Sequence, residues 1–208
     1  MQNNQYYKIV FKVLIGVLGT MIVSLGAVFF IAANNGMDPI SVFAQGLSNK
    51  TGLQLGTWSL MSGMIVLVIV YLLDRKMLKW GSLINAFGVG FFINVIMSIY
   101  VPKFSNSFQS ALGTVFGAFL LGFGLSVVIF ANIGMGPWEG LMTYISNKTN
   151  ISIKFIRILM DLALTLIGFI LGGTIGFGSI IGVFGIGPII EYSLKGLNCV
   201  FKQTKEAN

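Results

Sequence analysis

The chain has 208 residues, of which 55% are hydrophobic and only 9% are charged, and its formal net charge is +7. A soluble domain carries roughly 25% charged residues, so these charges are too few to cover a water-soluble globule. The sequence contains no histidine and one cysteine, Cys199. This composition excludes histidine metal sites, Ser-His-Asp triads and an internal disulfide. We therefore expect no enzyme, no metal and no cofactor.

Apolar runs of about 20 residues predict membrane-spanning helices. The first run follows a basic N-terminus and is longer than the ~7–15 apolar residues of a signal peptide, so it is interpreted as a retained helix. The last run keeps a helical spacing of apolar residues as far as Phe201 and could extend to it. The sequence predicts an all-α polytopic membrane protein, one membrane domain over residues 1–208, with six spans at 9–33, 55–73, 81–101, 111–131, 153–172 and 176–194.

The basic residues predict the orientation of these spans. If both termini are cytoplasmic, every lysine and arginine except Lys50 and Lys103 falls on the cytoplasmic side. This segregation satisfies the positive-inside rule for six helices. The basic charge is therefore interpreted as a topology signal and not as a nucleic-acid surface.

The sequence repeats itself. Residues 31–51 match residues 129–149 at a constant offset of 98, with ten of 21 positions identical, and residues 81–94 match 178–191 at an offset of 97. The shared Asn, Gly, Pro and Lys residues are not explained by chance similarity of apolar segments. Two repeats follow, at about 8–101 and 108–201. Because each carries three spans, the second copy is expected to be inverted, as in many secondary transporters; alternatively, the duplication merely built a helical bundle.

A turn follows the first span of each repeat. Its common residues are Asn34, Gly36 and Pro39 in the first copy, and Asn132, Gly134 and Pro137 in the second. Proline suits the first position of a helix, and Asp38 or Gly136 can cap it. We expect a short amphipathic helix of about 12 residues after each proline. That helix could lie on the membrane surface, or it could be re-entrant and point its positive N-terminal end at a cavity.

Acids within the apolar segments are the other candidates, because a charge at membrane depth usually faces a cavity or a partner. Asp161 follows Arg157 by four residues, which predicts an interfacial salt bridge. Glu191, whose repeat equivalent is Asn94, is either a mid-depth proton or cation site or a surface partner of Lys195. The pathway candidates are Asn34, Gly36, Asp38, Pro39, Asn132, Gly134, Pro137, Trp138, Glu139, Asn94 and Glu191.

Glu139 and Asn94 also have purely structural interpretations. An acid in the first turn of a helix, as expected for Glu139, is favoured by the helix dipole alone. A buried amide such as that of Asn94 can join two helices by hydrogen bonds. The sequence leaves both interpretations open.

Three motifs resemble the YczE/YyaS/YitT group of bacterial integral membrane proteins. They are the turn 36–39 (Gly-Met-Asp-Pro), the segment 55–59 (Leu-Gly-Thr-Trp-Ser) and the segment 134–139 (Gly-Met-Gly-Pro-Trp-Glu). The first copy departs from the last motif, with Ile40 and Ser41 in place of Trp138 and Glu139. The resemblance covers essentially the whole chain and implies a bacterial plasma-membrane location, but no substrate and no catalytic residues.

These observations favour a small secondary transporter that moves a small solute by rocking one repeat against the other. The alternative is a non-transporting membrane protein that regulates or scaffolds another membrane or export component. A polar cavity lined by both turns would favour transport, and a solid apolar centre would favour a scaffold. The expected partners are the lipid bilayer and a small solute, and the glycine-rich helix faces would permit a homodimer.

Overall fold

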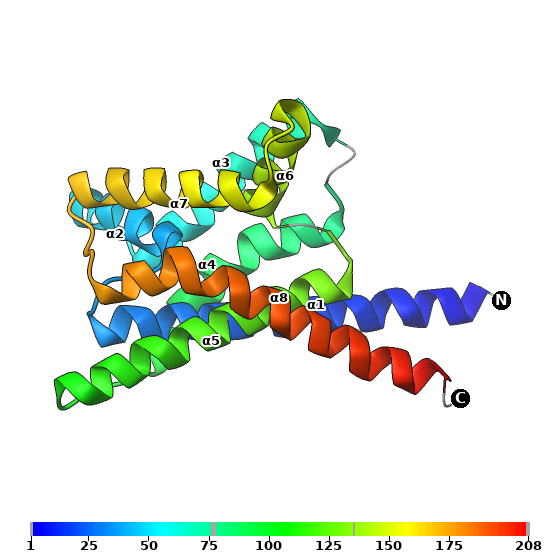
Figure 1. The fold of residues 1–208 in the computed structure, drawn as a ribbon, viewed down its shortest axis with the longest axis horizontal. Coiled ribbons are helices and arrows are strands. Elements are labelled where there is room, and N and C mark those ends of the chain that lie inside the picture. The colour runs from blue at the N-terminus through cyan, green and yellow to red at the C-terminus, as the bar shows by residue number, and fades with distance from the viewer. Residues whose placement is uncertain (1, 76–77, 135, 207–208) are drawn as a thin grey trace.

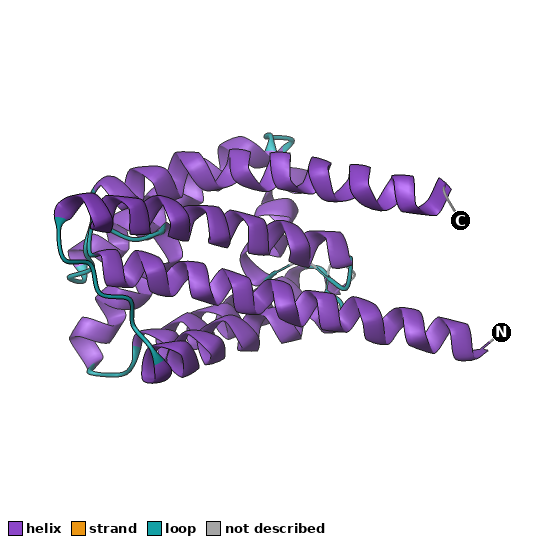
Figure 2. Cartoon of the chain, turned by 90° about the horizontal axis from the view of Figure 1, so that it is seen from below, coloured by secondary structure: helices purple, strands orange, loops and turns teal. Residues whose placement is uncertain are grey.

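The computed structural model describes residues 2–75, 78–134 and 136–206, and these residues form eight α-helices and no strand (Figures 1 and 2). The long helices lie side by side, and the two termini lie at the same end of the molecule (Figure 1). In chain order the helices are α1 (Gln2–Ala33), α2 (Pro39–Thr51), α3 (Leu55–Leu73), α4 (Trp80–Ile99), α5 (Ser107–Ala131), α6 (Pro137–Thr149), α7 (Ile153–Ile170) and α8 (Phe177–Glu206).

Five of these helices contain a segment that is long and apolar enough to cross a membrane: Ile9–Ala33 in α1, Leu55–Leu73, Gly81–Ile99 in α4, Ser107–Ala131 and Phe177–Val200 in α8. The predicted all-helical, multi-span fold is confirmed at this level. The predicted span at 153–172 forms α7, but it is not among the five, because its 18 residues include Lys154, Arg157 and Asp161. Helix α8 follows the longer of the two alternatives and continues past Phe201.

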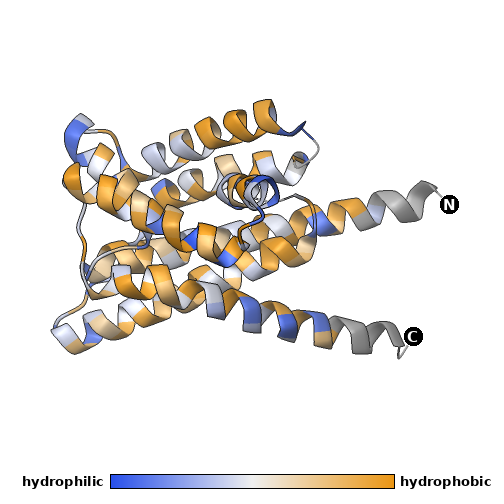
Figure 3. Cartoon of the chain, turned by 45° about the horizontal axis from the view of Figure 1, so that its top comes forward, coloured by the Kyte–Doolittle hydropathy of each residue, from blue (hydrophilic) through white to orange (hydrophobic). Residues whose placement is uncertain are grey.

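The hydrophobic side chains face outwards as well as inwards. Exposed apolar residues occur along all the long helices, among them Leu72, Ile99, Phe108 and Ile170. The hydropathy colouring shows that hydrophobic residues dominate these helices along most of their length (Figure 3). Soluble monomers rarely expose contiguous apolar patches beyond a few hundred Å². The surface is that of a membrane protein.

The two sequence repeats correspond helix for helix. Helices α2 and α6 begin and end at equivalent positions, Pro39–Thr51 and Pro137–Thr149. Helix α1 packs on α4 as α5 packs on α8, and α2 packs on α7 as α6 packs on α3. Exchanging the two halves therefore preserves the contacts between helices.

Helices α1 and α5 form the centre of the bundle and cross at glycines. A Cβ atom added at Gly26 would lie 2.6 Å from the Leu121 backbone N, and one added at the equivalent Gly124 would lie 2.6 Å from the Val23 backbone N. Gly19 lies against Gly124, and Gly26 against Gly117, so the helices run antiparallel. The small-residue faces predicted for these helices are used for this close packing.

The duplicated Ser-Asn-Lys-Thr segment ends each short helix. Ser48 Oγ donates a hydrogen bond to the Leu53 carbonyl (2.6 Å), and Ser146 Oγ donates to the Ile151 carbonyl (2.7 Å). The next residues after the helices, Gly52 and Asn150, are left-handed, with φ of 74° and 57°. Because such a residue suits a helix C-terminus, both copies keep the same stop signal.

Candidate functional site

Both turns reverse the chain with left-handed residues. After α1, Asn34 has φ 53° and Gly36 has φ 91°; after α5, Asn132 has φ 51° and Gly134 has φ 148°. Asparagine and glycine are the residues that adopt this region at least cost. Each helix therefore stops at the asparagine, two residues before the glycine of the turn.

The first turn places the start of α2 inside the bundle. Asp38 caps the helix: its Oδ2 accepts a hydrogen bond from the Ser41 backbone N–H (3.2 Å). Asp38 is only 6% exposed. It faces Gly182 of α8, where an added Cβ would lie 2.9 Å from the Asp38 Cα. A side chain at Gly182 would displace the turn, so the capping carboxylate needs a glycine opposite it.

The second turn places the start of α6 inside the bundle from the other half. Gly136 occupies the cap position, and an added Cβ there would collide with the Glu139 carboxylate and lie 3.0 Å from the Asn85 Oδ1 of α4. The carboxylate of the first helical turn thus folds back over the helix start, where the dipole favours an acid. The Asn85 amide, at the position equivalent to Gly182, lies against it.

A partly open cavity of about 90 Å³ lies between the two helix starts. Its polar and charged lining residues come from Asp38 of the first turn and from α2, α3, α4, α6 and α7, and most of its aliphatic lining residues come from α1, α4, α5 and α8. We call the second set the apolar wall. The lining residues are Val23, Ala27, Asp38, Pro39, Ile40, Ser41, Ser59, Gly63, Asn85, Ala86, Val89, Ile93, Leu121, Leu125, Pro137, Trp138, Glu139, Met142, Arg157, Asp161, Gly182 and Ile186. We call this space the central cavity.

Most lining residues form pairs related by the repeat. Pro39 pairs with Pro137, Ser41 with Glu139, Ser59 with Arg157, Gly63 with Asp161, Val23 with Leu121, and Asn85 with Gly182. The central cavity is therefore built from equivalent positions of both halves. Its chemistry is not equivalent, because the second half supplies a base and two acids where the first half has two serines and a glycine.

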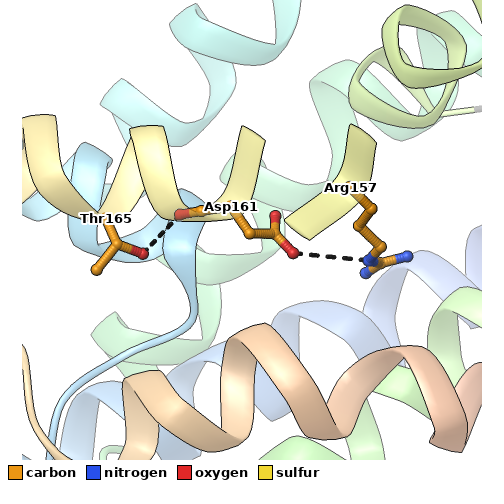
Figure 4. Close-up of polar contacts among 3 residues, drawn as sticks. All are labelled: Arg157, Asp161 and Thr165. Carbon is orange, nitrogen blue, oxygen red and sulfur yellow. Dashed lines mark hydrogen bonds and ion pairs between the residues drawn. The ribbon is translucent and has the colours of Figure 1, made fainter. Parts of the chain in front are cut away.

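Arg157 and Asp161 form the predicted ion pair, with 3.7 Å between Arg157 Nε and Asp161 Oδ2 (Figure 4). Thr165 Oγ1 donates a hydrogen bond to the Asp161 carbonyl (2.7 Å), one turn further along α7. The sequence favoured an interfacial location for this pair. In the structure Asp161 is buried and both side chains line the central cavity.

Three polar atoms of the cavity wall are buried and make no hydrogen bond within the part of the chain that the structure describes: Asp38 Oδ1, Asn85 Nδ2 and Arg157 Nε. Asp38 and Asn85 are 6% and 7% exposed. A buried polar group without a partner costs roughly 1–3 kcal/mol. Such atoms on the wall of a cavity are typical of a site that receives a polar ligand or water.

The structure gathers some of the sequence candidates and separates others. The five that line the central cavity are Asp38, Pro39, Pro137, Trp138 and Glu139. The four that shape the turns without lining it are Asn34, Gly36, Asn132 and Gly134. Met135 of the second turn lies outside the described residues.

Asn94 and Glu191 lie away from the cavity. Asn94 Nδ2 donates a hydrogen bond to Thr57 Oγ1 of α3 (3.1 Å), so its amide joins two helices. Glu191 is 65% exposed at its side chain and pairs with Lys195, Oε1 to Nζ 2.7 Å. The structure thus has the pair with Lys195 on the outer face of α8, although the helix continues beyond Leu194.

Asn85, Arg157, Asp161 and Ser59 are cavity residues that were not among the pathway candidates. An alignment of the two repeats could have indicated them, because it places the charged Arg157 and Asp161 at the positions of the small Ser59 and Gly63. A pair of equivalent positions that differ in charge, next to a duplicated turn, marks a place where the two halves face a shared space.

A model of a family of unknown function (DUF6198) matches residues 10–195 of the chain. The chain is similar to the Bacillus subtilis (strain 168) "Uncharacterized membrane protein YczE", with 31% identity over 159 residues, 76% of this chain and 74% of that protein. It is 28% identical to "Uncharacterized protein YyaS" of the same organism, over 80% of this chain and 84% of that protein. An "Uncharacterized protein" of Haemophilus influenzae is 27% identical, over 83% and 78%. No solved structure matches the chain.

Proposed function

The chain belongs to the DUF6198 family of unknown function, and we propose its function from its own geometry: it is a small secondary transporter that moves a small solute through the central cavity. The observation that carries the proposal is the cavity itself. It is lined by both turns and by equivalent positions of both repeats, and its wall holds buried polar atoms that make no hydrogen bond among the described residues.

The proposed membrane arrangement has six spans and two inverted repeats. The support for α7 as the sixth span is its surface: Phe155, Leu159, Leu166 and Ile170 are exposed, while Asp161 is turned inwards. Apart from Lys154 in its first turn, which is exposed, the charged residues of α7 are turned towards the cavity, and a helix that hides its acid in this way suits a bilayer. The antiparallel course of the equivalent helices α1 and α5 supports the inversion.

The proposed orientation places both termini in the cytoplasm of a bacterium, with the protein in the plasma membrane. Both termini lie at one end of the molecule together with the α3–α4 connection (Figure 1), and the basic residues of these segments follow the positive-inside rule. Lys50, one of the two outlying lysines, ends α2 beside the α7–α8 connection, where Asn49 Nδ2 donates to the Gly172 carbonyl (2.7 Å).

In this arrangement α2 and α6 are re-entrant. Each starts at a buried proline in the cavity wall and ends in an exposed Lys-Thr sequence at the surface of the molecule. Transport then consists of opening the cavity to each side in turn, with one repeat moving against the other about the crossing of α1 and α5. The protein binds and releases a solute and catalyses no reaction.

The test is the accessibility of the cavity from the two faces of the membrane. In a Cys199→Ser background, Ser59→Cys places a thiol on the cavity wall, and Ser62→Cys, a buried position on the same helix outside the lining, is the matched control. The small impermeant cation MTSET is applied to right-side-out and to inside-out vesicles. We expect labelling of Ser59→Cys in both preparations and of Ser62→Cys in neither. Labelling of Ser59→Cys from one side only, or from neither, would contradict transport and favour a regulatory or scaffolding protein.

A further inference from the structure

The central cavity has an excess of acid. Its wall carries the carboxyl groups of Asp38, Glu139 and Asp161 and one guanidinium group, that of Arg157. The carboxyl groups of Asp38 and Glu139 are close enough to Asp161 to interact with it by charge. With all groups ionised the wall holds an excess of two negative charges, and an anionic solute would increase it.

The helix starts do not leave a site for an anion. An anion is usually attracted to the free N–H groups at a helix N-terminus. At α2 the Asp38 carboxylate accepts a hydrogen bond from the Ser41 N–H, and at α6 the Glu139 carboxylate folds over the helix start. Both positive helix ends are therefore already met by the protein's own acids.

One acceptor atom is left over. Asp38 Oδ2 is used by the cap, but Asp38 Oδ1 is buried in the cavity wall and accepts no hydrogen bond from any residue that the structure describes. A protonated amine supplies both the hydrogen bond and the charge that this atom lacks. Trp138 also lines the cavity, and tryptophan is the side chain that attracts a cation most strongly through its ring.

The other wall of the cavity is apolar. Val23 and Ala27 of α1 face the space together with Leu121, Leu125 and Ile186. A hydrated metal ion gains nothing from such a wall, whereas an aliphatic group is favourably removed from water there. The cavity is small, about 90 Å³, so the organic part of the solute is short.

From these features we infer, on the basis of the proposed transport function, that the solute is a small organic ammonium ion, with its charged nitrogen at Asp38 Oδ1 and its short aliphatic part against the α1–α5 wall. Glu139 and Asp161 add to the attraction, and Arg157 limits it so that the ion can leave.

The experiment measures protection of the cavity thiol. Ser59→Cys in the Cys199→Ser background is labelled with N-ethylmaleimide, a neutral reagent, in the presence of ethylammonium chloride, sodium acetate or acetamide. All samples are brought to the same ionic strength with sodium chloride, which alone is the reference. We expect ethylammonium to slow labelling about tenfold near saturation, and acetate and acetamide to leave the rate within about twofold of the reference.

Acid-removing variants locate the effect. Asp38→Asn keeps a residue that caps helices as well as aspartate does and is expected to abolish protection by ethylammonium. Glu191→Gln, which removes an exposed acid outside the cavity, is the matched control and should retain it. If Asp38→Asn is not recovered folded, Glu139→Gln replaces it. In that variant the factor by which ethylammonium slows labelling is expected to fall about fivefold or more.

Several results would overturn the inference: equal protection by acetate or acetamide, no protection by ethylammonium, or full protection in the acid-removing variant. In each of these cases labelling of Ser59→Cys from both faces of the membrane would still support transport of another solute. Labelling of Ser59→Cys from one face only, or from neither, would instead contradict the proposed function itself.

Discussion

The two turns at the central cavity occupy equivalent positions of the two repeats but divide their polar atoms differently. In the first turn the cap residue Asp38 carries the carboxylate, and the facing helix offers Gly182. In the second turn the cap is Gly136, and the facing helix offers the amide of Asn85. In each turn, the contact between the cap position and the facing helix thus combines one glycine with one polar residue. The polar residue is the cap in the first turn and belongs to the facing helix in the second.

This difference shows how two halves with equivalent helix packing can place different residues in one shared cavity. The space at each turn admits one side chain in addition to the backbone, so a polar group gained on one side requires a glycine on the other. The halves could diverge in chemistry without changing their helix packing. As a result the second half carries Arg157 and Asp161, while the equivalent Ser59 and Gly63 keep the first half small.

The largest effect on stability is expected from removal of Arg157, the basic residue of the cavity wall. Arg157→Ala leaves Asp38, Glu139 and Asp161 without the guanidinium that offsets their charge. Breaking a buried pair in this way costs about 3 kcal/mol, and at this chain length that lowers the melting temperature by roughly 6–12 °C. Thermal unfolding of the purified protein in detergent, followed by tryptophan fluorescence, measures it.

Two variants control for this result. Ser59→Ala, at the equivalent position of the first half, should change the melting temperature by at most about 2 °C, since it removes no charge. Asp161→Ala should cost less than Arg157→Ala, because Arg157 keeps two other acids on the same cavity wall. Equal losses for Arg157→Ala and Asp161→Ala would contradict the idea that the cavity holds an excess of acid.

A smaller effect is expected from rebuilding the second turn as a copy of the first. Gly136→Asp alone should cost about 2 kcal/mol, because its Cβ meets the Glu139 carboxylate and a like charge is added beside it. Adding Glu139→Ser, which copies Ser41, clears that space, so that the new carboxylate at position 136 can accept a hydrogen bond from the N–H of position 139 as Asp38 does from that of Ser41. We expect the double variant to recover about 1 kcal/mol.

A double-mutant cycle over the four proteins measures this recovery as an interaction energy from thermal unfolding in detergent. A third change, Asn85→Gly, completes the copy and should recover more, since the Asn85 amide also borders the space at Gly136. Strict additivity of the first two changes would show that the two turns do not share the packing rule proposed for them.

The helices of the fold were largely predictable from the sequence because their signals are local. Apolar length gave the bounds of α3 at both ends, and the prolines at Pro39 and Pro137 gave the starts of α2 and α6. Helix α7 shows where this reasoning is weakest. Its three charged residues keep it below the level of a clear span, and only its packing shows that Asp161 faces inwards.

The site was predictable only in part, because its two turns are local features and its other walls are tertiary ones. The sequence pointed to Asp38 and Glu139 through their motif. It could not show that Asn85, some 50 residues away, lies against the second turn. For Glu191 it left two locations open, and the choice depends on which face of α8 packs on α5.

The smallest effect is expected where the two halves have not diverged. Ser48 and Ser146 each donate one hydrogen bond to a carbonyl five residues on, over 2.6 and 2.7 Å, in exposed surroundings. Ser48→Ala and Ser146→Ala should each cost about 0.5–1 kcal/mol, the net value of one such bond. The two losses should be equal, because the local structures are the same.

The two losses should also add in the double variant. Ser146 lies near the start of α7, while Asn49, next to Ser48, bonds to Gly172 at the end of α7. The 18 residues of α7 separate the sites by about 27 Å, well beyond the distance over which substitutions couple. Thermal unfolding of both single variants and the double variant checks this. Unequal losses would mean that the two ends of the molecule differ in stability although the hydrogen bonds of Ser48 and Ser146 are equivalent, so that the divergence of the halves extends beyond the cavity.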